Sequence, residues 1–481
     1  MSKLFYILLF LALPLSAQIN VVPQPNQITY HKGTCPISTK ISYIQDKSIN
    51  NPEGYQLIIK PNQIIIKFAT EAGKFYAEQT FNQLVFGAEV THKKSLPCLT
   101  ITDAPRFAYR ALMIDPARHY WKIDDIKKYI DVMAHYKFNY LHLHLTDDQG
   151  WRIEIKKYPK LTEIGSKRSD FEGSKRNNEG FYTQEQIKDL VLYALQRNVQ
   201  LVPEFDVPGH SDAAIAAYPF LSCNDTLIGV RTTAGVSKNL LCVGKEEVFT
   251  FIDDVITELS AIFPCPYFHI GGDEAPMDKW LEHSPTLKLK QSLHTTNNQQ
   301  LMSEFFKRVN QSLEKNHKRP LIWLELEVPS YPQNSVMYLW RMRTTPQVLE
   351  RAKKDNFKLI CSPGEYAYFD YPQAKNDLPN VDWMPTLTLQ RVYEFNPAFS
   401  LTAEEEKQYI LGVEATLWGE SVKDVFRAFY MTYPRALALS EAGWTEMPKR
   451  DWQQFTQKLD LQLRYLLHKG INYRPPVELY Q

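Results

Sequence analysis

From Phe107 onward the sequence repeats one unit, an apolar strand-like run that ends in polar or aromatic residues. We identify eight such runs, covering residues 109–115, 138–145, 199–206, 267–272, 320–325, 335–340, 357–362 and 409–418. Strands that alternate with helices pair in parallel, and eight units favour a closed (β/α)8 barrel, the TIM barrel. An open, doubly wound sheet is the alternative fold. No glycine-rich phosphate-binding motif follows the first strand, so nucleotide binding has no support.

Amphipathic helices are predicted between several of these strands. The apolar residues of 123–133 and of 248–259 recur at helical spacing, so each segment has one buried face. A further helix is predicted to start at Thr183, because Gln186 stands three residues later in the pattern of a capping box. The helices after the fifth and sixth strands are less clearly marked in the sequence.

The segment before the barrel has a different pattern. Residues 54–70 alternate between apolar and polar side chains around Pro61-Asn62, which predicts a β-hairpin. Residues 71–85 then have helical spacing. We therefore predict an α/β protein with two domains, a small α/β domain over residues 18–105 and a (β/α)8 barrel catalytic domain over residues 106–481.

The first residues have the composition of a secretory signal peptide. Lys3 precedes an apolar run from Leu4 to Leu15, and the small residues Ser16-Ala17 follow. The run is short for a bilayer span, which needs about 20 apolar residues, so a membrane anchor is the weaker alternative. We predict a signal peptide over residues 1–17 and export to a periplasm or to the outside of the cell, without stable membrane insertion.

Net charge and cysteine content bear on the partners and on the compartment of the protein. The formal net charge is +1 over 481 residues and no basic tract is present, which argues against nucleic acid. The six cysteines fit an exported protein. Cys223 and Cys242 bracket a polar segment that a disulfide would close, and both the bonded and the free state remain open. No Cys or His pair has metal-ligand spacing, so no metal and no cofactor are expected.

Polar or aromatic side chains stand at the carboxyl end of every predicted strand. In strand order they include Arg118; His144 and Asp147; Asp206 and His210; Asp273 and Glu274; Trp323; Trp340; Tyr368 and Asp370; Trp418 and Glu420. In isolation, an Asp-Arg pair is often a structural salt bridge and a Trp is often core. Recurrence at the same end of every strand favours one shared pocket instead, since barrel active sites form at that face.

Carboxylates beside stacking aromatics indicate a carbohydrate substrate. The sequence is rich in aromatics, with 27 Tyr, 25 Phe and 9 Trp. Most glycosidases place two carboxylates about 5 Å or more apart on opposite sides of the bond. The adjacent Asp273 and Glu274 fit that scheme poorly. Neighbouring side chains on a regular strand also point to opposite faces, so we expect Gly271 and Gly272 to let the backbone leave the pleat.

Four motifs together resemble glycoside hydrolase family 20, the β-N-acetylhexosaminidases. They are HIGGDE (residues 269–274), HLTDDQGWRIEIKKYPKLTEIGS (144–166), PEFDVPGH (203–210) and LWGE (417–420). The resemblance covers almost the whole chain after residue 17, and the first domain resembles the small α/β domain of that family. Three features depart from the family pattern: Ala111, Leu143 and the segment LWRMRTTPQ (339–347), which lies where it can reshape the leaving-group side.

The resemblance implies exo-acting, retaining hydrolysis of terminal non-reducing β-linked N-acetylhexosamine, either GlcNAc or GalNAc. In such substrate-assisted catalysis the substrate's own 2-acetamido oxygen attacks the anomeric carbon and forms an oxazolinium intermediate. Glu274 would be the general acid and then the base, Asp273 would stabilise the acetamido N–H, and Tyr368 would donate to the acetamido oxygen. The remaining residues would bind the sugar or support the acid: Trp323, Trp340 and Trp418 as pocket walls, Arg118, Asp370 and Glu420 at the sugar hydroxyls, and Asp147, His144, Asp206 and His210 around the acid.

Two alternatives to this function stay open. The first is a non-catalytic glycan-binding protein on the same scaffold, which loss of Asp273, Glu274 or Tyr368 would favour; all three are present. The second is a hydrolase of the same architecture that releases a disaccharide or processes chitooligosaccharides. The partner predicted in every case is a glycan or glycoconjugate, and no oligomeric state is predicted.

Overall fold

The computed structural model describes residues 19–169, 179–379 and 384–479. The predicted signal peptide, residues 1–17, lies outside these ranges. The chain forms two units: one comprises the residues up to Ala104 together with Gln454–Gln462, and the other comprises Pro105–Gln453 and Leu463 onward. Nowhere in the described part of the chain is a helix both long enough and apolar enough to cross a membrane.

The first unit is a five-stranded sheet with one long helix, as the sequence predicts for its central part. The strands are β1 (Gln27–Pro36), β2 (Ile41–Gln45), β3 (Tyr55–Lys60), β4 (Gln63–Phe68) and β5 (Ser95–Asp103), in the order β1-β5-β3-β4-β2. The predicted hairpin is present, with Lys60 paired with Gln63 across the turn. Helix α1 (Glu71–Val90) packs against β3, β4 and β5, and alternate apolar side chains of β3 and β4 are buried there.

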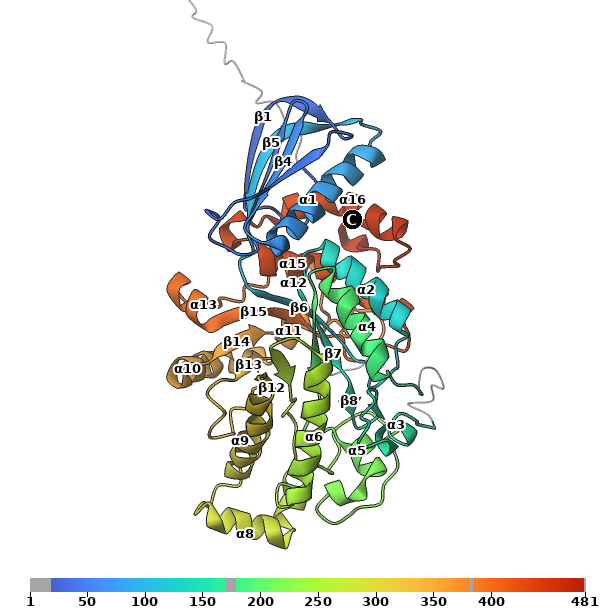
Figure 1. The fold of residues 1–481 in the computed structure, drawn as a ribbon, viewed down its shortest axis with the longest axis vertical. Helices are drawn as coiled ribbons and strands as arrows, with labels where there is room; N and C mark the ends of the chain where they lie inside the picture. The colour runs from blue at the N-terminus through green and yellow to red at the C-terminus, as the bar shows by residue number, and fades with distance from the viewer. Residues whose placement is uncertain (1–18, 170–178, 380–383, 480–481) are drawn as a thin grey trace, which may run out of the picture. The chain divides into compact units, whose positions relative to one another are not determined.

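The second unit contains a closed barrel of eight parallel strands, which confirms the predicted fold (Figure 1). The strands are β6 (Tyr109–Ile114), β7 (Tyr140–His144), β10 (Gln200–Glu204), β11 (Tyr267–His269), β12 (Arg319–Trp323), β13 (Val336–Leu339), β14 (Lys358–Cys361) and β15 (Ile410–Ala415). They pair in chain order, and β15 closes the ring by pairing with β6. Each lies within one of the eight predicted runs or extends it by one residue.

Helices follow the strands on the outside of the barrel (Figure 1). Helix α4 begins after Thr183 with the predicted capping box, in which Thr183 and Gln186 bond each other's backbone N–H. No helix joins β12 to β13, where a loop runs instead. The helices of this unit are α2 (Ile123–His135), α3 (Lys160–Glu163), α4 (Gln184–Leu195), α5 (Asp212–Ala217), α6 (Glu246–Ile262), α7 (Asp278–Leu281), α8 (Ser284–Ser292), α9 (Gln300–Lys315), α10 (Thr345–Asp355), α11 (Gly364–Ala367), α12 (Leu389–Tyr393), α13 (Ala403–Tyr409), α14 (Val425–Thr432) and α15 (Arg435–Trp444), and α16 (Trp452–His468) spans the two units.

The barrel interior is buried but partly polar. Glu414 on β15 accepts hydrogen bonds from the hydroxyls of Tyr109 and Tyr338, and its other oxygen lies 2.8 Å from Nδ1 of His142. All four side chains are fully buried. Buried polar atoms need hydrogen-bond partners. This interior network therefore fixes the side-chain rotamers of these residues on the strands that lead up to the site.

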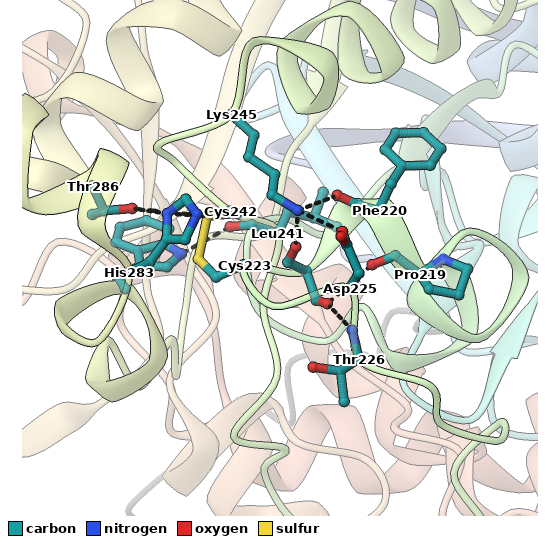
Figure 2. The surroundings of a disulfide bond; sticks show 12 residues. Pro219, Phe220, Cys223, Asp225, Thr226, Leu241, Cys242, Lys245, His283 and Thr286 are labelled. Carbon is teal, nitrogen blue, oxygen red and sulfur yellow. Dashed lines mark hydrogen bonds and ion pairs between the residues drawn. A yellow bond between two sulfur atoms is a disulfide. The ribbon is translucent and has the colours of Figure 1, made fainter.

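A disulfide joins Cys223 and Cys242, the pair that the sequence left open. Figure 2 shows that the closed loop is also tied down at its start, where the ammonium group of Lys245 donates to Asp225 at 2.7 Å and to the carbonyls of Phe220 and Ser222. Cys265 and Cys361 are buried free thiols. The disulfide therefore organises one long loop on the side of the barrel that carries the site.

Candidate active site

The adjacent acids Asp273 and Glu274 lie where strand β11 gives way to irregular backbone. Gly271 and Gly272 have φ of +63° and +96°, and Glu274 has φ of +48°. A Cβ at position 271 would stand 1.6 Å from Oδ1 of Asp206, so only glycine fits there. The Gly272 N–H donates to the same oxygen at 3.2 Å. The left-handed backbone, which glycine adopts readily, thus brings both acids to one pocket.

This pocket, of about 220 Å³, opens at the carboxyl ends of the barrel strands. All the sequence-predicted site residues except His144 and Trp323 line it. The lining is Arg118, Asp147, Asp206, His210, Asp273, Glu274, Trp340, Tyr368, Asp370, Tyr371, Trp418 and Glu420. The side chains at the carboxyl ends of the barrel strands therefore lie around one pocket, which is the arrangement that the barrel fold predicts.

His144 and Trp323 lie directly behind the pocket wall. The ring of His144 meets the Trp418 ring edge-on at 5.1 Å, and the Trp323 ring lies 5.8 Å from that of Trp418. Both side chains are almost completely buried. Both contact Trp418, which lines the pocket, and neither belongs to the lining itself.

A chain of polar contacts connects the barrel interior to the two acids. Asp147 Oδ2 lies 2.7 Å from Nε2 of His144, and its Oδ1 lies 3.2 Å from Nδ1 of His210. Nε2 of His210 then lies 3.9 Å from Asp273 Oδ2 and 3.8 Å from Glu274 Oε2. His210 therefore stands between Asp147 and both acids.

Arg118 is the arginine that lines the pocket. Its guanidinium pairs with Asp147 at 2.7 Å and with Asp115 at 2.9 Å, and it lies 3.8 Å from Glu420. Its Nε–H also donates to Gln149 at 2.8 Å. The side chain is only 5% exposed, so these contacts hold one fixed orientation toward the pocket.

The buried charges shift one another's pKa. Burial alone would raise the pKa of Asp147, but Arg118 and His210 hold it well below its usual range. Asp147 in turn raises the pKa of His210 far above its usual value, against the effect of burial. Burial raises the pKa of Asp273 to about 6, opposed by His210 and reinforced by Glu274. Burial and Asp273 also raise the pKa of Asp206.

Aromatic rings form the side of the pocket next to Asp273. The Tyr368 ring lies 6.3 Å from that of Trp418 and 5.5 Å from that of Tyr371. Burial raises the pKa of Tyr368 well above its usual value, with a further contribution from Asp273, so the hydroxyl keeps its proton. A neutral phenol close to Asp273 is suited to donate a hydrogen bond to a bound ligand.

Two residues important to this arrangement were not among the sequence predictions. Tyr371 lines the pocket. Glu204, the last residue of β10, accepts the indole N–H of Trp323 and contacts His144 at very short range, and its oxygens lie 3.1 Å from Nε2 of His142 and 2.9 Å from Nδ1 of His269. The motif PEFD contains Glu204, yet nothing in the sequence shows that it points inward at three histidines.

Some of these residues also have spacings that a cation would accept. His144, Asp147 and Asp206 form one such cluster, and Asp206, His210 and Asp273 form another. In the structure, Asp147 of the first cluster pairs with Arg118, His144 and His210. The contacts of these residues therefore form a network of ion pairs.

A carboxylate-rich pocket walled by tryptophans, at the carboxyl end of a closed (β/α)8 barrel, defines the class of the protein as a carbohydrate-active hydrolase. The model of the glycosyl hydrolase family 20 catalytic domain matches residues 107–447, and that of the family's domain 2 matches residues 40–104. The chain belongs to glycosyl hydrolase family 20 and is a glycoside hydrolase.

Individual relatives agree with this assignment. A β-hexosaminidase of Akkermansia muciniphila is 38% identical over 461 residues, which cover 95% of this chain and 92% of the relative. The crystal structure of a β-N-acetylhexosaminidase, 36% identical, superimposes with a TM-score of 0.89 and covers 94% of this chain and 96% of its own. The exo β-N-acetylglucosaminidase of Vibrio harveyi in complex with N-acetylglucosamine, 30% identical, has a TM-score of 0.84 over 95% of this chain and 78% of its own.

Proposed function

We propose that this protein is an exo-acting, retaining β-N-acetylhexosaminidase that releases terminal non-reducing β-linked GlcNAc or GalNAc from glycans. One observation carries the proposal: Asp273 and Glu274, though adjacent in sequence, both reach the pocket and both lie within 4 Å of Nε2 of His210. This arrangement offers one acid for the leaving group and one carboxylate for the substrate's acetamido group. The nucleophile then comes from the sugar itself.

Glu274 is the general acid and base of this proposal. Its side chain is 38% exposed, which leaves it open to the leaving-group side of the pocket. In the first step the Glu274 carboxyl donates its proton to the glycosidic oxygen as the C1–O bond breaks and the acetamido oxygen bonds to C1. In the second step the Glu274 carboxylate takes a proton from water, and the water oxygen bonds to C1 as the oxazolinium ring opens.

Asp273 and Tyr368 hold the acetamido group while it reacts. Oδ1 of Asp273 is buried and has no hydrogen-bond partner within residues 19–169, 179–379 and 384–479, so it is available to accept the acetamido N–H. That bond stabilises the positive charge that develops on nitrogen. The neutral Tyr368 hydroxyl donates to the acetamido oxygen, and the rings of Trp340 and Trp418 align the group for attack.

The far end of the pocket binds the terminal sugar. Arg118 and Glu420 lie 3.8 Å apart, and Oδ1 of Asp370 is another buried oxygen for which the described residues provide no hydrogen bond. These groups can form hydrogen bonds with the hydroxyls of the non-reducing terminal sugar. Pockets for drug-sized ligands hold roughly 300–1,000 Å³, so about 220 Å³ favours one sugar ring over a disaccharide.

The relatives support the same substrate. The Akkermansia muciniphila relative is named a β-hexosaminidase, and the Vibrio harveyi enzyme is named an exo β-N-acetylglucosaminidase in complex with N-acetylglucosamine. The direct test is release of nitrophenol from the nitrophenyl β-glycosides of GlcNAc, GalNAc and their disaccharides. Hydrolysis of either monosaccharide glycoside supports the proposal. Hydrolysis of the disaccharide glycosides alone would assign the chain to a disaccharide-releasing hydrolase instead.

We further propose that the protein is exported. The pattern of residues 1–17 is that of a signal peptide, and the Cys223–Cys242 disulfide fits an oxidising compartment. N-terminal sequencing of the enzyme purified from its native cells tests this. The expected mature chain begins near Gln18, and a mature chain that keeps residues 1–17 would contradict export by cleavage.

A further inference from the structure

A second cavity, of about 400 Å³, adjoins the acid side of the active site. Glu274 lines both cavities, and the second one also contains Glu325, Glu327 and Gln299. Because Glu274 faces the leaving group in the proposed reaction, a cavity that shares its side chain lies where the leaving part of the substrate emerges. None of the residues to which the sequence assigned a catalytic or binding role, other than Glu274, belongs to it.

The cavity combines an apolar floor with carboxyl groups. Met302 and Val328 are almost fully buried, with exposures of 3% and 2%. Val236, by contrast, is 44% exposed and comes from the disulfide-closed loop. Its neighbour Ser237 donates to Asp212 at 2.9 Å, which holds this part of the loop in place. An apolar surface of this kind accepts the face of a ring, either a sugar or an aryl group.

The segment 339–347 contacts both cavities, because Trp340 lines the active site and Arg341 contacts Glu325 of the second cavity. The guanidinium group of Arg341 stacks 3.6 Å above the ring of Trp340, which lines the active site. Nη1 of Arg341 lies 3.4 Å from Oε2 of Glu325, and Nη2 lies 3.4 Å from Oε1. The charge of Arg341 is therefore directed at Glu325, and the lining of the second cavity contains no lysine or arginine among the described residues.

We propose that this cavity is the leaving-side subsite and that its exposed carboxylate, Glu327, selects neutral or cationic leaving groups over anionic ones. The inference rests on the proposed function, because it assigns a second part of the same substrate. Glu327 is exposed at the edge of the cavity and has no ion pair with the residues that the structure describes, so its charge reaches an incoming leaving group. Glucosaminyl and other amine-bearing leaving groups fit, whereas uronic, sulfated or sialylated ones are repelled.

The test uses three aryl β-N-acetylglucosaminides that differ only in the ring substituent: 4-(aminomethyl)phenyl, 4-(carboxymethyl)phenyl and the neutral 4-methylphenyl. At low ionic strength the wild-type kcat/KM should favour the cationic substrate over the anionic one by roughly 3- to 10-fold, the effect of one partly solvated charge. Glu327→Gln should bring this ratio close to one, and Glu327→Lys should invert it. Added salt should bring the wild-type ratio closer to one, because salt screens the charge of Glu327.

The matched control is Glu404→Gln, which removes an exposed glutamate of α13, the helix that leads into the opposite end of strand β15. This variant should keep the wild-type ratio. A ratio that is the same in wild type, Glu327→Gln and Glu327→Lys would overturn the inference while leaving the proposed function intact. Absence of hydrolysis of the neutral substrate would instead contradict the proposed function itself.

Discussion

Oε1 of Glu204 accepts the indole N–H of Trp323 at 3.0 Å. Oε2 of the same carboxylate lies 3.1 Å from His142 and still closer to His144, which in turn contacts Asp147. The buried side chain of Glu204 therefore holds Trp323 in place behind the pocket. It also holds His144, the first member of the chain of polar contacts that leads through Asp147 to His210. Burial opposes ionisation of Glu204, but the three histidines around it hold its pKa well below the usual value.

Glu204→Gln should weaken both the fold and the catalysis. An amide cannot replace all the contacts of the carboxylate, and removing the charge leaves His142 and His144 with one carboxylate each, Glu414 and Asp147. Breaking a buried ion pair on one side destabilises a protein by about 3–5 kcal/mol. Thermal unfolding should show that loss, and kcat should fall as well. Glu204→Asp keeps the charge and should recover part of both, whereas wild-type stability in Glu204→Gln would contradict the role given to this residue.

Asp273→Asn should raise stability while it lowers activity. The pKa of Asp273 in the folded state is about 6, above an ordinary value of about 3.9, so the folded protein binds the proton more tightly between these values. Stability therefore falls as pH rises from about 4 to 6, and the ionised carboxylate costs on the order of 1–3 kcal/mol above that window.

The Asp273→Asn substitution removes that cost. The variant should therefore have a higher melting temperature than the wild type at pH 7.5, with the difference disappearing near pH 4. The wild-type kcat/KM should rise as pH increases through about 6, because the reaction needs the ionised Asp273, and this acid limb should be absent in the variant. Equal melting temperatures at pH 7.5 together with an unchanged pH profile would contradict this account.

Tyr368→Phe should lower kcat by about 10²-fold with little change in stability. The substitution removes one hydroxyl donor for the acetamido oxygen, and loss of one donor to developing charge has an effect of this order. The ring contacts with Trp418 and Tyr371 remain. Steady-state kinetics and thermal unfolding measured side by side check the expectation. A loss of stability that accounts for the lost activity would argue for a structural role.

Removing the disulfide should destabilise the protein by about 3 kcal/mol, the loop-closure effect for a bridge with a sequence separation of 19. The double variant Cys223→Ser/Cys242→Ser should melt at a lower temperature than the wild type, and reductant should lower the melting temperature of the wild type only. The four buried free thiols provide the control, because a reductant does not change them. A wild type that is insensitive to complete reduction of this bond would contradict the expectation.

Much of the fold follows from local patterns. The eight strands, the hairpin over residues 54–70 and the cap at Thr183 depend on periodicity and turn chemistry, which a short window of sequence contains. The polar strand ends also predict most of the pocket, because the barrel brings all these ends to one face.

What could not be predicted depends on contacts between distant residues. Glu204 and Trp323 are 119 positions apart, and only the closed barrel aims them at each other. The contacts of Trp323 with Glu204 and Trp418 are therefore not visible in the motif alone. The leaving-side cavity likewise combines the disulfide-closed loop, α9 and the loop after β12, and none of these segments has a catalytic motif of its own.

The assignment of Glu274 as the proton donor is the central claim, and the turnover of Glu274→Gln tests it most directly. The comparison uses aryl β-N-acetylglucosaminides with a poor leaving group, such as 4-methylphenol, and a good one, such as dinitrophenol. Protonation of the leaving oxygen contributes roughly 10²- to 10⁴-fold, so the variant should lose that much kcat on the poor leaving group and far less on the good one. Wild-type turnover of both substrates by Glu274→Gln, or an equal loss on both, would contradict the assignment.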